Sequence, residues 1–522
     1  MSVDTNNAAF QGALNLIQYT RQSVFLTGKA GTGKSTFLRY VCENTKKKHV
    51  VLAPTGIAAI NAGGSTMHSF FKLPFYPLLP DDPNLSLQRG RIHEFFKYTK
   101  PHRKLLEQIE LVIIDEISMV RADIIDAIDR ILRVYSHNLR EPFGGKQLLL
   151  VGDVFQLEPV VKNDEREILN RFYPTPYFFS ARVFGQIDLV SIELQKVYRQ
   201  TDPVFVGVLD HIRNNTAGAA DLQLLNTRYG SQIEESEADM YITLATRRDT
   251  VDSINEKKLA ELPGDPITFE GVIEGDFPES SLPTSQELVL KPGAQIIFIK
   301  NDFDRRWVNG TIGVIAGIDE EEETIYVITD NGKECDVKRE SWRNIRYRYN
   351  EKTKEIEEEV LGSFTQYPIR LAWAITVHKS QGLTFSRVVI DFTGGVFAGG
   401  QAYVALSRCT SLDGIQLKKP INRADVFVRP EIVNFAGRFN DRQAIDKALK
   451  QAQADVQYAA ASRAFDKGDM EECLEQFFRA IHSRYDIEKP IPRRFIRRKL
   501  GVINTLKEQN KKLKEQMREQ QE

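Results

Sequence analysis

The stretch Gly28-Lys29-Ala30-Gly31-Thr32-Gly33-Lys34-Ser35 decides the fold of this chain. It follows a short apolar run, Val24–Leu26, and opens a helix-like segment, Ser35–Cys42. A glycine-rich turn between a strand and a helix is the context that a phosphate-binding loop requires. Its backbone N–H groups converge on phosphate oxygens, and the positive end of the following helix adds to the attraction. The stretch therefore predicts an α/β domain that binds a nucleoside triphosphate.

Two side chains of this loop have roles that the backbone cannot supply. We expect the Lys34 ammonium group to reach the β- and γ-phosphates of ATP, and the Ser35 hydroxyl to ligate Mg²⁺. The predicted nucleotide contacts are Gly28, Lys29, Ala30, Gly31, Thr32, Gly33, Lys34, Ser35 and Thr36.

A second apolar run, Leu111–Ile114, ends in two carboxylates. Ligands of open α/β sheets bind at the carboxyl ends of the strands, which is where Asp115 and Glu116 would lie. We expect Asp115 to help hold Mg²⁺ and Glu116 to polarise the attacking water. A helix N-cap is the alternative interpretation of adjacent acidic residues, and the phosphate loop earlier in the chain favours the catalytic one.

Strand-like and helix-like segments alternate along the chain. The runs Val50–Ala53 and Gln147–Val151 are typical of buried strands, and apolar residues between 124 and 132 recur at helical spacing. A second alternating region begins near Leu189 and includes the strand-like runs Tyr241–Ala245 and Val388–Ile390. This alternation predicts the α/β class, with parallel sheets covered by helices.

Two segments interrupt the alternation. Leu73–Pro101 is rich in proline and aromatic residues and is too long for a passive loop, so it predicts a small subdomain or a working element. Within the second region, β-branched runs are joined by Asn309-Gly310 and Asn331-Gly332, which are strong hairpin signals and predict an all-β insertion. These runs are Ile296–Ile299, Thr311–Ile315 and Ile325–Ile328.

The chain becomes helical in character after about Ile421. Ala460–Ile481 resembles one tetratricopeptide hairpin, although a solenoid needs about three repeats. Residues 490–522 hold ten Lys/Arg and four Glu, a net charge of +6. Apolar residues and one asparagine recur there at the 4-3 spacing of a short coiled coil: Ile503, Leu506, Asn510, Leu513 and Met517.

Composition sets broad bounds on the class of protein. The chain has 522 residues, 42% of them hydrophobic and 27% charged, with a net charge of −1, which indicates a globular protein of three or four domains. No apolar run is long enough for a transmembrane helix, and no secretory signal is recognisable. Four cysteines without metal-ligand spacing indicate reduced thiols. We expect a cytoplasmic protein, bacterial and associated with the nucleoid.

Three further residues are candidates for sensing or stabilising the γ-phosphate. Gln156 follows a strand in the segment Gly152–Leu157, where a polar group beside the phosphate would lose its partner on hydrolysis. Arg199 and Arg408 each follow an aromatic residue in the second region and are candidate arginine fingers. A surface location is the alternative for an isolated arginine. The segment Thr376–Thr384, rich in small polar residues and glycine, suits contacts to the phosphates of a nucleic-acid strand.

The order of these motifs resembles that of superfamily 1B DNA helicases, and most closely the Pif1 family. The resemblance spans about Phe10 to Lys418, and Glu158 departs from it by standing where the family pattern has proline. Besides the loop, its motifs are Ala53–Ala59, Gly63–Ser69, Asp115–Met119, Ile131–Arg133 with Pro142–Gly145, Gly152–Gln156, Tyr198–Gln200, Thr376–Thr384 and Tyr403–Arg408.

The resemblance implies two RecA-like domains that clamp ATP and Mg²⁺ between them. Residues 1–188 would form the first, with a duplex-splitting insertion at about 72–101. Residues 189–423 would form the second, with an SH3-like insertion at about 304–364. A helical region, 424–489, and a basic tail, 490–522, would follow. It also implies movement along single-stranded DNA from 5′ to 3′, with Arg199 and Arg408 reaching the nucleotide from the second domain and Gln11 contacting the adenine.

The implied partners are single-stranded DNA and forked or structured DNA. From the residues themselves, Phe70 and Phe71 could stack on bases or belong to the core. The predicted DNA contacts are Pro54, Thr55, Gly56, His68, Phe71, Thr376, His378 and Lys379.

Three functional hypotheses follow. The first is an ATP-driven 5′→3′ DNA helicase, and the second is a translocase that remodels nucleoprotein or RNA–DNA hybrids without efficient unwinding. In the third, the region from Ala424 onward recruits a protein partner. The alternative for that region is a helical cap followed by a disordered basic tail that adds non-specific DNA affinity.

Overall fold

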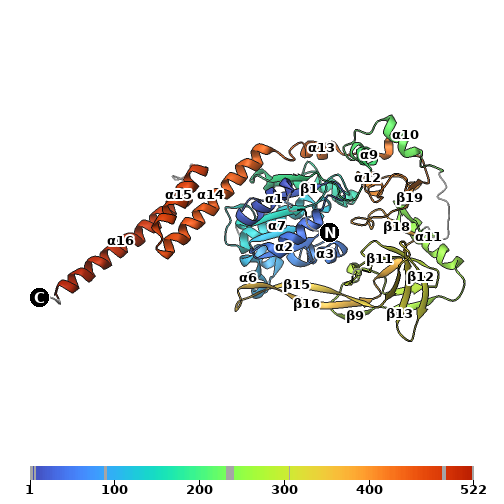
Figure 1. The fold of residues 1–522 in the computed structure, drawn as a ribbon, viewed down its shortest axis with the longest axis horizontal. Helices are drawn as coiled ribbons and strands as arrows, with labels where there is room; N and C mark the ends of the chain where they lie inside the picture. Colours follow the sequence, from blue (N-terminus) through green and yellow to red (C-terminus); the bar gives the residue numbers. More distant parts are fainter. Residues whose placement is uncertain are drawn as a thin grey trace. The chain divides into compact units, whose positions relative to one another are not determined.

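The computed structural model describes residue 4 and residues 7–86, 91–200, 202–230, 240–304, 306–484 and 490–519. The chain divides into two compact units, Met1–Asp441 and Arg442–Glu522. The first unit contains two α/β domains and a β region (Figure 1). None of the helices formed by the described residues is both long enough and apolar enough to cross a bilayer.

The first domain is built on a six-stranded sheet in the order β3-β2-β4-β5-β1-β6, and all of its strand pairs are parallel. Parallel strands end at a common edge, so the residues that follow β1, β4 and β5 lie close together. The predicted α/β class is confirmed for this domain. The strands are β1 (Val24–Gly28), β2 (His49–Ala53), β3 (Ser65–Thr66), β4 (Leu111–Ile114), β5 (Gln147–Val151) and β6 (Val190–Leu194).

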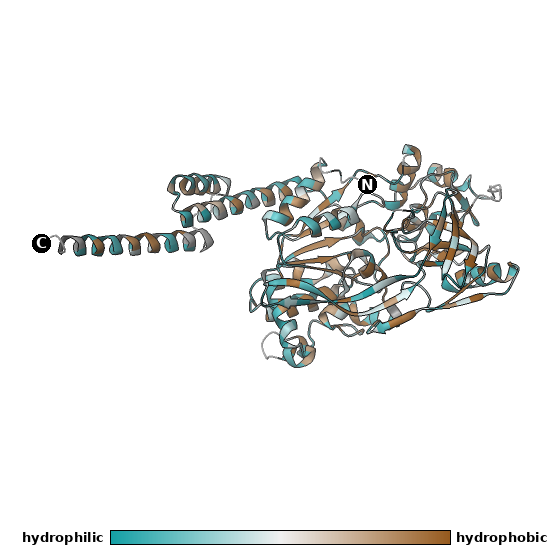
Figure 2. Ribbon diagram, turned by 60° about the horizontal axis from the view of Figure 1, so that its bottom comes forward, coloured by the Kyte–Doolittle hydropathy of each residue, from teal (hydrophilic) through white to brown (hydrophobic). Residues whose placement is uncertain are grey.

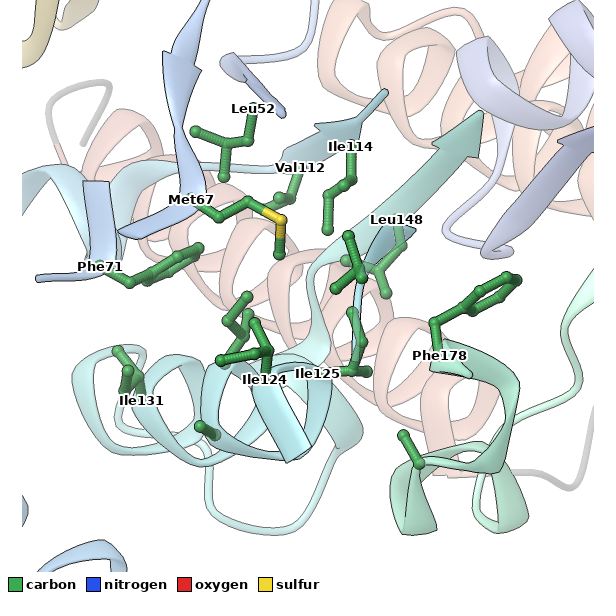
Figure 3. Close-up of a cluster of buried hydrophobic side chains, with 14 of the residues drawn as sticks. Leu52, Met67, Phe71, Val112, Ile114, Ile124, Ile125, Ile131, Leu148 and Phe178 are labelled. Atoms are coloured by element: carbon green, nitrogen blue, oxygen red, sulfur yellow. The ribbon is translucent and has the colours of Figure 1, made fainter. Parts of the chain in front are cut away.

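Helices cover this sheet and bury its apolar residues. Figure 3 shows Ile124 and Ile125 of α7 directed toward Ile114 and Leu148 of the strands, and all four side chains are buried. Burying each such side chain contributes about 2 kcal/mol. The helices are α1 (Ala8–Tyr19), α2 (Lys34–Asn44), α3 (Gly56–Ala62), α4 (Met67–Phe71), α5 (Arg91–Phe96), α6 (Lys100–Gln108), α7 (Ala122–Tyr135) and α8 (Asn163–Leu169). Short 3-10 turns are η1 (Pro83–Leu85), η2 (Ile117–Met119), η3 (Pro142–Gly145), η4 (Phe178–Ser180) and η5 (Arg182–Gly185).

The predicted domain boundary after residue 188 is wrong. Strand β6 lies beside β1, with Val190 opposite Val24 and Leu194 opposite Gly28. It therefore belongs to the first sheet, whereas the alternation of the sequence predicts it to begin the second domain. The pairing partner of a strand cannot be inferred from the strand's own apolar pattern, which is why the boundary was misplaced.

The second domain has a four-stranded parallel sheet in the order β18-β7-β19-β20. The strands predicted at Tyr241–Ala245 and Val388–Ile390 are its two central strands. Its strands are β7 (Ile242–Ala245), β18 (Ala374–Thr376), β19 (Val388–Asp391) and β20 (Ile415–Leu417). Its helices are α9 (Pro203–Arg213), α10 (Ala219–Asn226), α11 (Arg248–Glu261) and α12 (Gln401–Leu406).

The β insertion is larger than the predicted 304–364, of which Arg305 lies outside the described residues. It forms three antiparallel sheets, in the orders β14-β13-β12-β11-β17, β15-β16-β9 and β10-β8. The hairpins predicted at the two Asn-Gly turns find further partners on both sides of that range. The strands are β8 (Ile267–Glu270), β9 (Val272–Gly275), β10 (Glu287–Leu290), β11 (Gln295–Phe298), β12 (Ile312–Asp319), β13 (Thr324–Thr329), β14 (Glu334–Val337), β15 (Glu340–Asn350), β16 (Glu355–Gln366) and β17 (Ile369–Leu371), with the turn η6 (Glu279–Ser281).

The long β15–β16 hairpin reaches the first domain beside α6 (Figure 1). The Tyr347 hydroxyl accepts a hydrogen bond of 3.3 Å from the backbone N–H of Val51, and its ring lies 6.1 Å from that of Phe70. Lys48 lies over the ring of Tyr349 at 5.2 Å. The β region is therefore attached to the first domain by side chains as well as to the second domain by the chain.

Residues 72–101 divide between core and surface, with 87–90 outside the described part. Leu78, Leu85 and Phe96 are buried in the core of the first domain. Phe75 is 85% exposed and Tyr76 is 52% exposed. The two most exposed aromatic rings in the described part of this segment therefore lie near its beginning.

The predicted helical region 424–489 is divided between the two units. After the turn η7 (Arg423–Asp425), helix α13 (Pro430–Ala436) packs on the first domain: Phe435 stacks on Phe179 with ring centroids 4.3 Å apart. Asn440 accepts a 2.8 Å hydrogen bond from the backbone N–H of Glu193. The chain up to Asp441 therefore belongs to the first unit.

The second unit is helical. Helices α14 (Arg442–Lys467) and α15 (Met470–Arg484) form the predicted hairpin, with Gly468 at a φ of 84° in the turn. Helix α16 (Pro490–Glu519) follows, while 485–489 and 520–522 lie outside the described residues. The alternative of a disordered basic tail is therefore wrong for α16, because its backbone is helical throughout.

We expect Phe71→Ala to lower the free energy of unfolding by about 3–5 kcal/mol, because its ring is fully buried. The matched control is Phe75→Ala, whose exposed ring should contribute less than about 0.5 kcal/mol. Urea unfolding followed by circular dichroism measures both. Equal effects of the two substitutions would contradict the assignment of Phe71 to the core.

Candidate nucleotide-binding and DNA-binding sites

The phosphate loop joins the end of β1 to the start of α2, as predicted. Gly31 and Gly33 have φ angles of 78° and 89°, a left-handed conformation that favours glycine. A Cβ atom on Gly28 would lie 2.6 Å from the Thr32 hydroxyl and 2.7 Å from the Leu194 carbonyl oxygen. Gly31 has no room for a side chain for another reason, since a Cβ atom there would overlap the Cβ atom of Arg199. The glycines are therefore required by conformation and by close approach.

Lys34 is held inside its own loop. Its ammonium group donates hydrogen bonds of 2.6 and 2.9 Å to the carbonyl oxygens of Gly28 and Lys29. Burial lowers the pKa of Lys34, while the carboxylates of Asp153 and Glu116 act in the opposite direction. A buried ammonium surrounded by carbonyl oxygens can exchange these acceptors for phosphate oxygens, which carry more negative charge.

Asp115 and Glu116 follow β4 as predicted. Burial raises the pKa of Asp115, and burial together with the Asp115 carboxylate raises the pKa of Glu116 to about 7. Glu116 has a φ of 49°, unusual for a residue with a side chain, and its side chain makes no capping hydrogen bond to η2. The N-cap alternative is therefore not supported for Glu116, and a carboxylate with a pKa near neutrality suits proton transfer.

Ser35 lies in the first turn of α2, at the end of the phosphate loop. A serine hydroxyl and one buried carboxylate are hard oxygen donors, the type that Mg²⁺ binds while keeping several waters. Among the described residues, no group of three or more His, Cys, Asp or Glu side chains could form a metal site made by protein alone. The donors present therefore fit a metal that is held jointly by the protein and a nucleotide.

Gln156 lies beside a buried ion-pair network that the sequence reasoning missed. Its amide nitrogen is 3.4 Å from an Asp153 carboxylate oxygen. The same carboxylate pairs at 3.1 Å with Arg213 of α9, which also pairs at 3.0 Å with Glu193 of β6. Arg213 stands in no recognisable motif, and only the position of Asp153 within Gly152–Gln156 could have pointed to this network. It links the first domain to the second directly behind Gln156.

Arg199 and Arg408 lie on the second-domain side of the loop, as the resemblance implies. Arg199 donates to the backbone carbonyl oxygens of Ser407 (3.2 Å) and Gly382 (3.4 Å). Arg408 is 1% exposed and donates to the carbonyl oxygens of Val404 (3.0 Å) and Ser380 (3.3 Å). Burial, reinforced by Arg199, lowers the pKa of Arg408 to about 9, which still leaves it charged at neutral pH. Both guanidinium groups are therefore charged and held by carbonyl oxygens.

A second contact across the loop was also missed. The Tyr403 hydroxyl of α12 accepts a 3.0 Å hydrogen bond from the backbone N–H of Ala30. The backbone N–H of Tyr198 donates to the Gly31 carbonyl oxygen at 2.9 Å. The aromatic residues that preceded the two predicted arginines therefore touch the loop themselves.

Gln11 lies in the first turn of α1, and α1 contacts β1, β6 and α2. This places its helix beside the phosphate loop. Its role in contacting adenine stays a prediction.

The predicted DNA contacts lie at the carboxyl ends of strands of both sheets, with one exception. Thr55 caps α3 after β2, its hydroxyl accepting from the N–H of Ala58 at 3.2 Å, and Pro54 and Gly56 flank it. His68 of α4 stacks on the exposed ring of Phe75, with centroids 5.0 Å apart and planes 7° apart.

Thr376 is the last residue of β18 of the second sheet, His378 and Lys379 follow that strand, and Lys379 is exposed. The exception among the predicted contacts is Phe71, which is fully buried, as is most of Phe70. Neither ring can stack on a base, because both fill the core of the first domain.

A groove of about 490 Å³ at the carboxyl ends of β7 and β19 was not predicted. It is lined by Arg247, Arg248, the 62% exposed ring of Phe397, Thr246, Asp249 and Gly394. The two consecutive arginines just after strand β7, Arg247 and Arg248, were the sequence signal that could have indicated this groove. Cationic and aromatic side chains at this edge can bind the phosphates and bases of a nucleic-acid strand.

Glu158, where the family pattern has proline, has a structural role. Its carboxylate accepts hydrogen bonds from Arg429 at 2.8 Å and from the Tyr177 hydroxyl at 2.7 Å. Burial alone would raise the pKa of Glu158, and these two bonds outweigh it, so the pKa is lowered. The residue therefore connects the segment after Gln156 to the start of α13.

A phosphate loop, a strand-end carboxylate pair and two arginines from a second α/β domain define a nucleoside triphosphatase whose nucleotide is contacted by both domains. The family model described as PIF1-like helicase matches residues 4–211. The ATP-dependent DNA helicase Pif1 of Campylobacter jejuni is 34% identical over 414 residues, covering 76% of this chain and 88% of that protein.

Solved structures of Pif1 helicases are also similar to this chain. Bacteroides sp. Pif1 in complex with ADP-AlF4 has a TM-score of 0.76 at 42% identity, covering 83% of this chain and 96% of that one. Bacteroides Pif1 bound to ssDNA has a TM-score of 0.60 at 41% identity, covering 84% and 98%. The chain belongs to the Pif1 family of ATP-dependent DNA helicases, which confirms the resemblance, the fold class and the enzymatic activity predicted from the sequence.

Because the pKa of Glu116 is raised to about 7, we expect kcat/KM for ATP to fall as the pH decreases through about 7. The carboxylate must be ionised to accept a proton from water, and this parameter reports the free enzyme. Steady-state ATPase assays between about pH 5.5 and 9 measure it. Glu116→Gln should lower the rate by about 10²–10⁴-fold and abolish this dependence. A flat profile in the wild type would contradict the role of Glu116 as base.

We expect Glu158→Ala and Arg429→Ala to be non-additive in the free energy of unfolding, with a coupling of about 0.5–1 kcal/mol. The magnitude is modest because the Arg429 side chain is 38% exposed. Lys162→Ala, an exposed cation nearby, should combine additively with Glu158→Ala and serves as the control. Additivity of the first pair would show that the contact does not stabilise the fold.

Proposed function

We propose that the chain moves along single-stranded DNA from 5′ to 3′ and separates duplex or structured DNA, using the free energy of Mg²⁺-dependent ATP hydrolysis. The observation that carries the proposal is the direct contact of Tyr198, Arg199 and Tyr403 with the phosphate loop. A nucleotide bound there would lie between groups of both domains. Its hydrolysis would therefore change the distance between surfaces that hold DNA.

Mg²⁺ would be held by the Ser35 hydroxyl and the Asp115 carboxylate, and it would neutralise phosphate charge. Lys34 would bind the β- and γ-phosphates, and Glu116 would accept a proton from the attacking water. Gln156, adjacent to the network of Asp153, would respond to the presence of the γ-phosphate.

Arg199 and Arg408 would stabilise the charge that develops on the γ-phosphoryl group. Each is charged and is held by neutral carbonyl oxygens, which can be exchanged for phosphate oxygens at little electrostatic cost. Removing such a finger lowers the rate by about 10³-fold or more in related chemistry.

Single-stranded DNA would cross the carboxyl-end edges of both sheets, over Thr55 and His68 on one domain and over Lys379 and the groove at Arg247 on the other. The relative described as bound to ssDNA has a TM-score of 0.60, against 0.76 for the complex described only with nucleotide, at almost equal identity. This supports a rearrangement of the domains when DNA binds. Stepwise movement requires such a change.

The exposed ring of Phe75, stacked on His68, is our candidate for separating the strands. Deleting the whole of residues 72–101 would remove core residues of the first domain, so a single substitution gives the cleaner test. Phe75→Ala should retain DNA-stimulated ATPase activity and lose most duplex separation. Loss of both activities would assign Phe75 to DNA binding instead.

The principal experiment measures ATPase activity with and without single-stranded DNA, and unwinding of duplexes with either a 5′ or a 3′ single-stranded tail. We expect stimulation by DNA and unwinding from the 5′ tail alone. Lys34→Ala should abolish hydrolysis and unwinding together, because the phosphates lose their cation.

The outcomes separate the alternatives. Unwinding from the 3′ tail would overturn the proposed polarity. Stimulated hydrolysis without unwinding from either tail would favour a translocase that remodels nucleoprotein or RNA–DNA hybrids. The cytoplasmic location and a protein partner for the helical second unit stay predictions.

A further inference from the structure

Helix α16 carries a narrow apolar stripe along its later part. Ile503, Leu506, Asn510 and Leu513 follow one another at steps of three and four residues along its helical backbone. Leu506 and Leu513 are each 58% exposed, which is unusual for leucine. Figure 2 shows hydrophobic residues recurring along this helix.

The earlier part of α16 is attached to the helical hairpin. Lys499 forms an ion pair with Asp466 of α14, and its ammonium group lies 4.3 Å from the ring centroid of Phe465. The stripe begins only after this contact. Residues 503–513 therefore follow this contact along the helix.

The residue types on the stripe fit a coiled-coil seam. In heptad notation, Ile503 and Asn510 occupy a positions, and Leu506 and Leu513 occupy d positions. A β-branched residue at a with leucine at d favours two strands, and a single asparagine at a specifies register and oligomeric state. A membrane surface or an unrelated apolar groove would give no reason for an amide in the centre of the stripe.

The amide also determines the orientation of the partner. In a parallel pair, Asn510 faces the same asparagine of the other helix, and each amide can donate to and accept from the other. In an antiparallel pair, it would face a leucine at a d position and lose its partner, at a cost of about 1–3 kcal/mol. An identical helix in parallel orientation therefore covers the apolar residues of the stripe and also supplies a hydrogen-bond partner for the Asn510 amide.

The flanking residues agree with this arrangement. In a parallel pair, Gln509 at g lies opposite Lys514 at e of the other helix, so no like charges meet there. Glu508, Lys511 and Lys512 point away from the seam and are exposed. The charged residues that keep the helix soluble are therefore on its outer face.

We propose that residues 503–513 of α16 pair with the same residues of a second copy of this chain in a parallel two-stranded coiled coil. Two copies of the chain, each with its own motor domains, would be joined in this way. The pairing is independent of the nucleotide site, because no residue of the seam belongs to it.

Sedimentation equilibrium of the full chain over a range of concentrations tests the proposal. We expect a reversible dimer, weakened at least about tenfold by Leu506→Glu and again by Leu513→Glu. The matched control is Lys511→Glu with Lys512→Glu, which changes charge on the outer face and should leave the dimer unchanged. ATPase activity stimulated by DNA should be retained in every variant, which shows that the motor domains are folded, and circular dichroism checks that the helical content is unchanged.

Two substitutions at position 510 test the register and orientation. Asn510→Val should strengthen self-association and allow oligomers larger than a dimer, because the specifying amide is lost. Asn510→Cys should form an intermolecular disulfide under mild oxidation, whereas Glu508→Cys on the outer face should not. Cys473→Ser in both backgrounds removes the nearest other thiol.

A monomer at all concentrations would overturn the proposal. So would a dimer that survives both leucine substitutions, since its interface would lie elsewhere. Self-association that is lost in the Lys511 and Lys512 control would overturn it as well, since the contact would then depend on the charged outer face and not on the apolar seam.

Discussion

The close approach of two domains to one phosphate loop is the constraint on which the rest of this structure depends. The loop can bend around phosphate groups only because Gly31 and Gly33 accept a left-handed backbone conformation. At Gly31 the space that a side chain would fill is occupied by Arg199. A single residue position thus serves both the nucleotide and the second domain.

The contacts around this point explain how nucleotide chemistry can be coupled to motion. Tyr403 bonds to the backbone of Ala30, so any change in the loop's conformation reaches α12 directly. Behind it, Arg213 pairs with Asp153 and Glu193 in a buried network. Breaking a buried ion pair leaves a charge without compensation, so such a network favours discrete arrangements over gradual deformation.

The chemistry of the site could be predicted from the sequence to a large extent, because its residues lie in short contiguous motifs. The loop, the acidic pair after β4 and the arginine at 199 all follow local patterns with recognisable spacing. The missed residues share a different property. Arg213 acquires its role only through partners on other elements, so nothing in its own neighbourhood indicates it.

The same distinction applies to the errors in the fold. The sequence predicts the wrong domain for strand β6 and too short a residue range for the β insertion. Both errors arise because the partners of a strand in a sheet are distant in sequence. Phe71 is predicted to contact DNA because an aromatic residue after a strand suits both base stacking and core packing. Only the surrounding core of the folded domain excludes base stacking. The departure at Glu158 has no explanation in its neighbouring residues, because its partner Arg429 lies far along the chain.

The sequence by itself therefore determined the class of protein, the nucleotide chemistry and the alternation of strands and helices. These depend on backbone conformation and side-chain types over a few consecutive residues. Only the tertiary structure decided where the domains end, which aromatic rings are exposed and which charged groups link the two domains. Those properties depend on burial and pairing between residues far apart along the chain, and local spacing carries no record of such contacts.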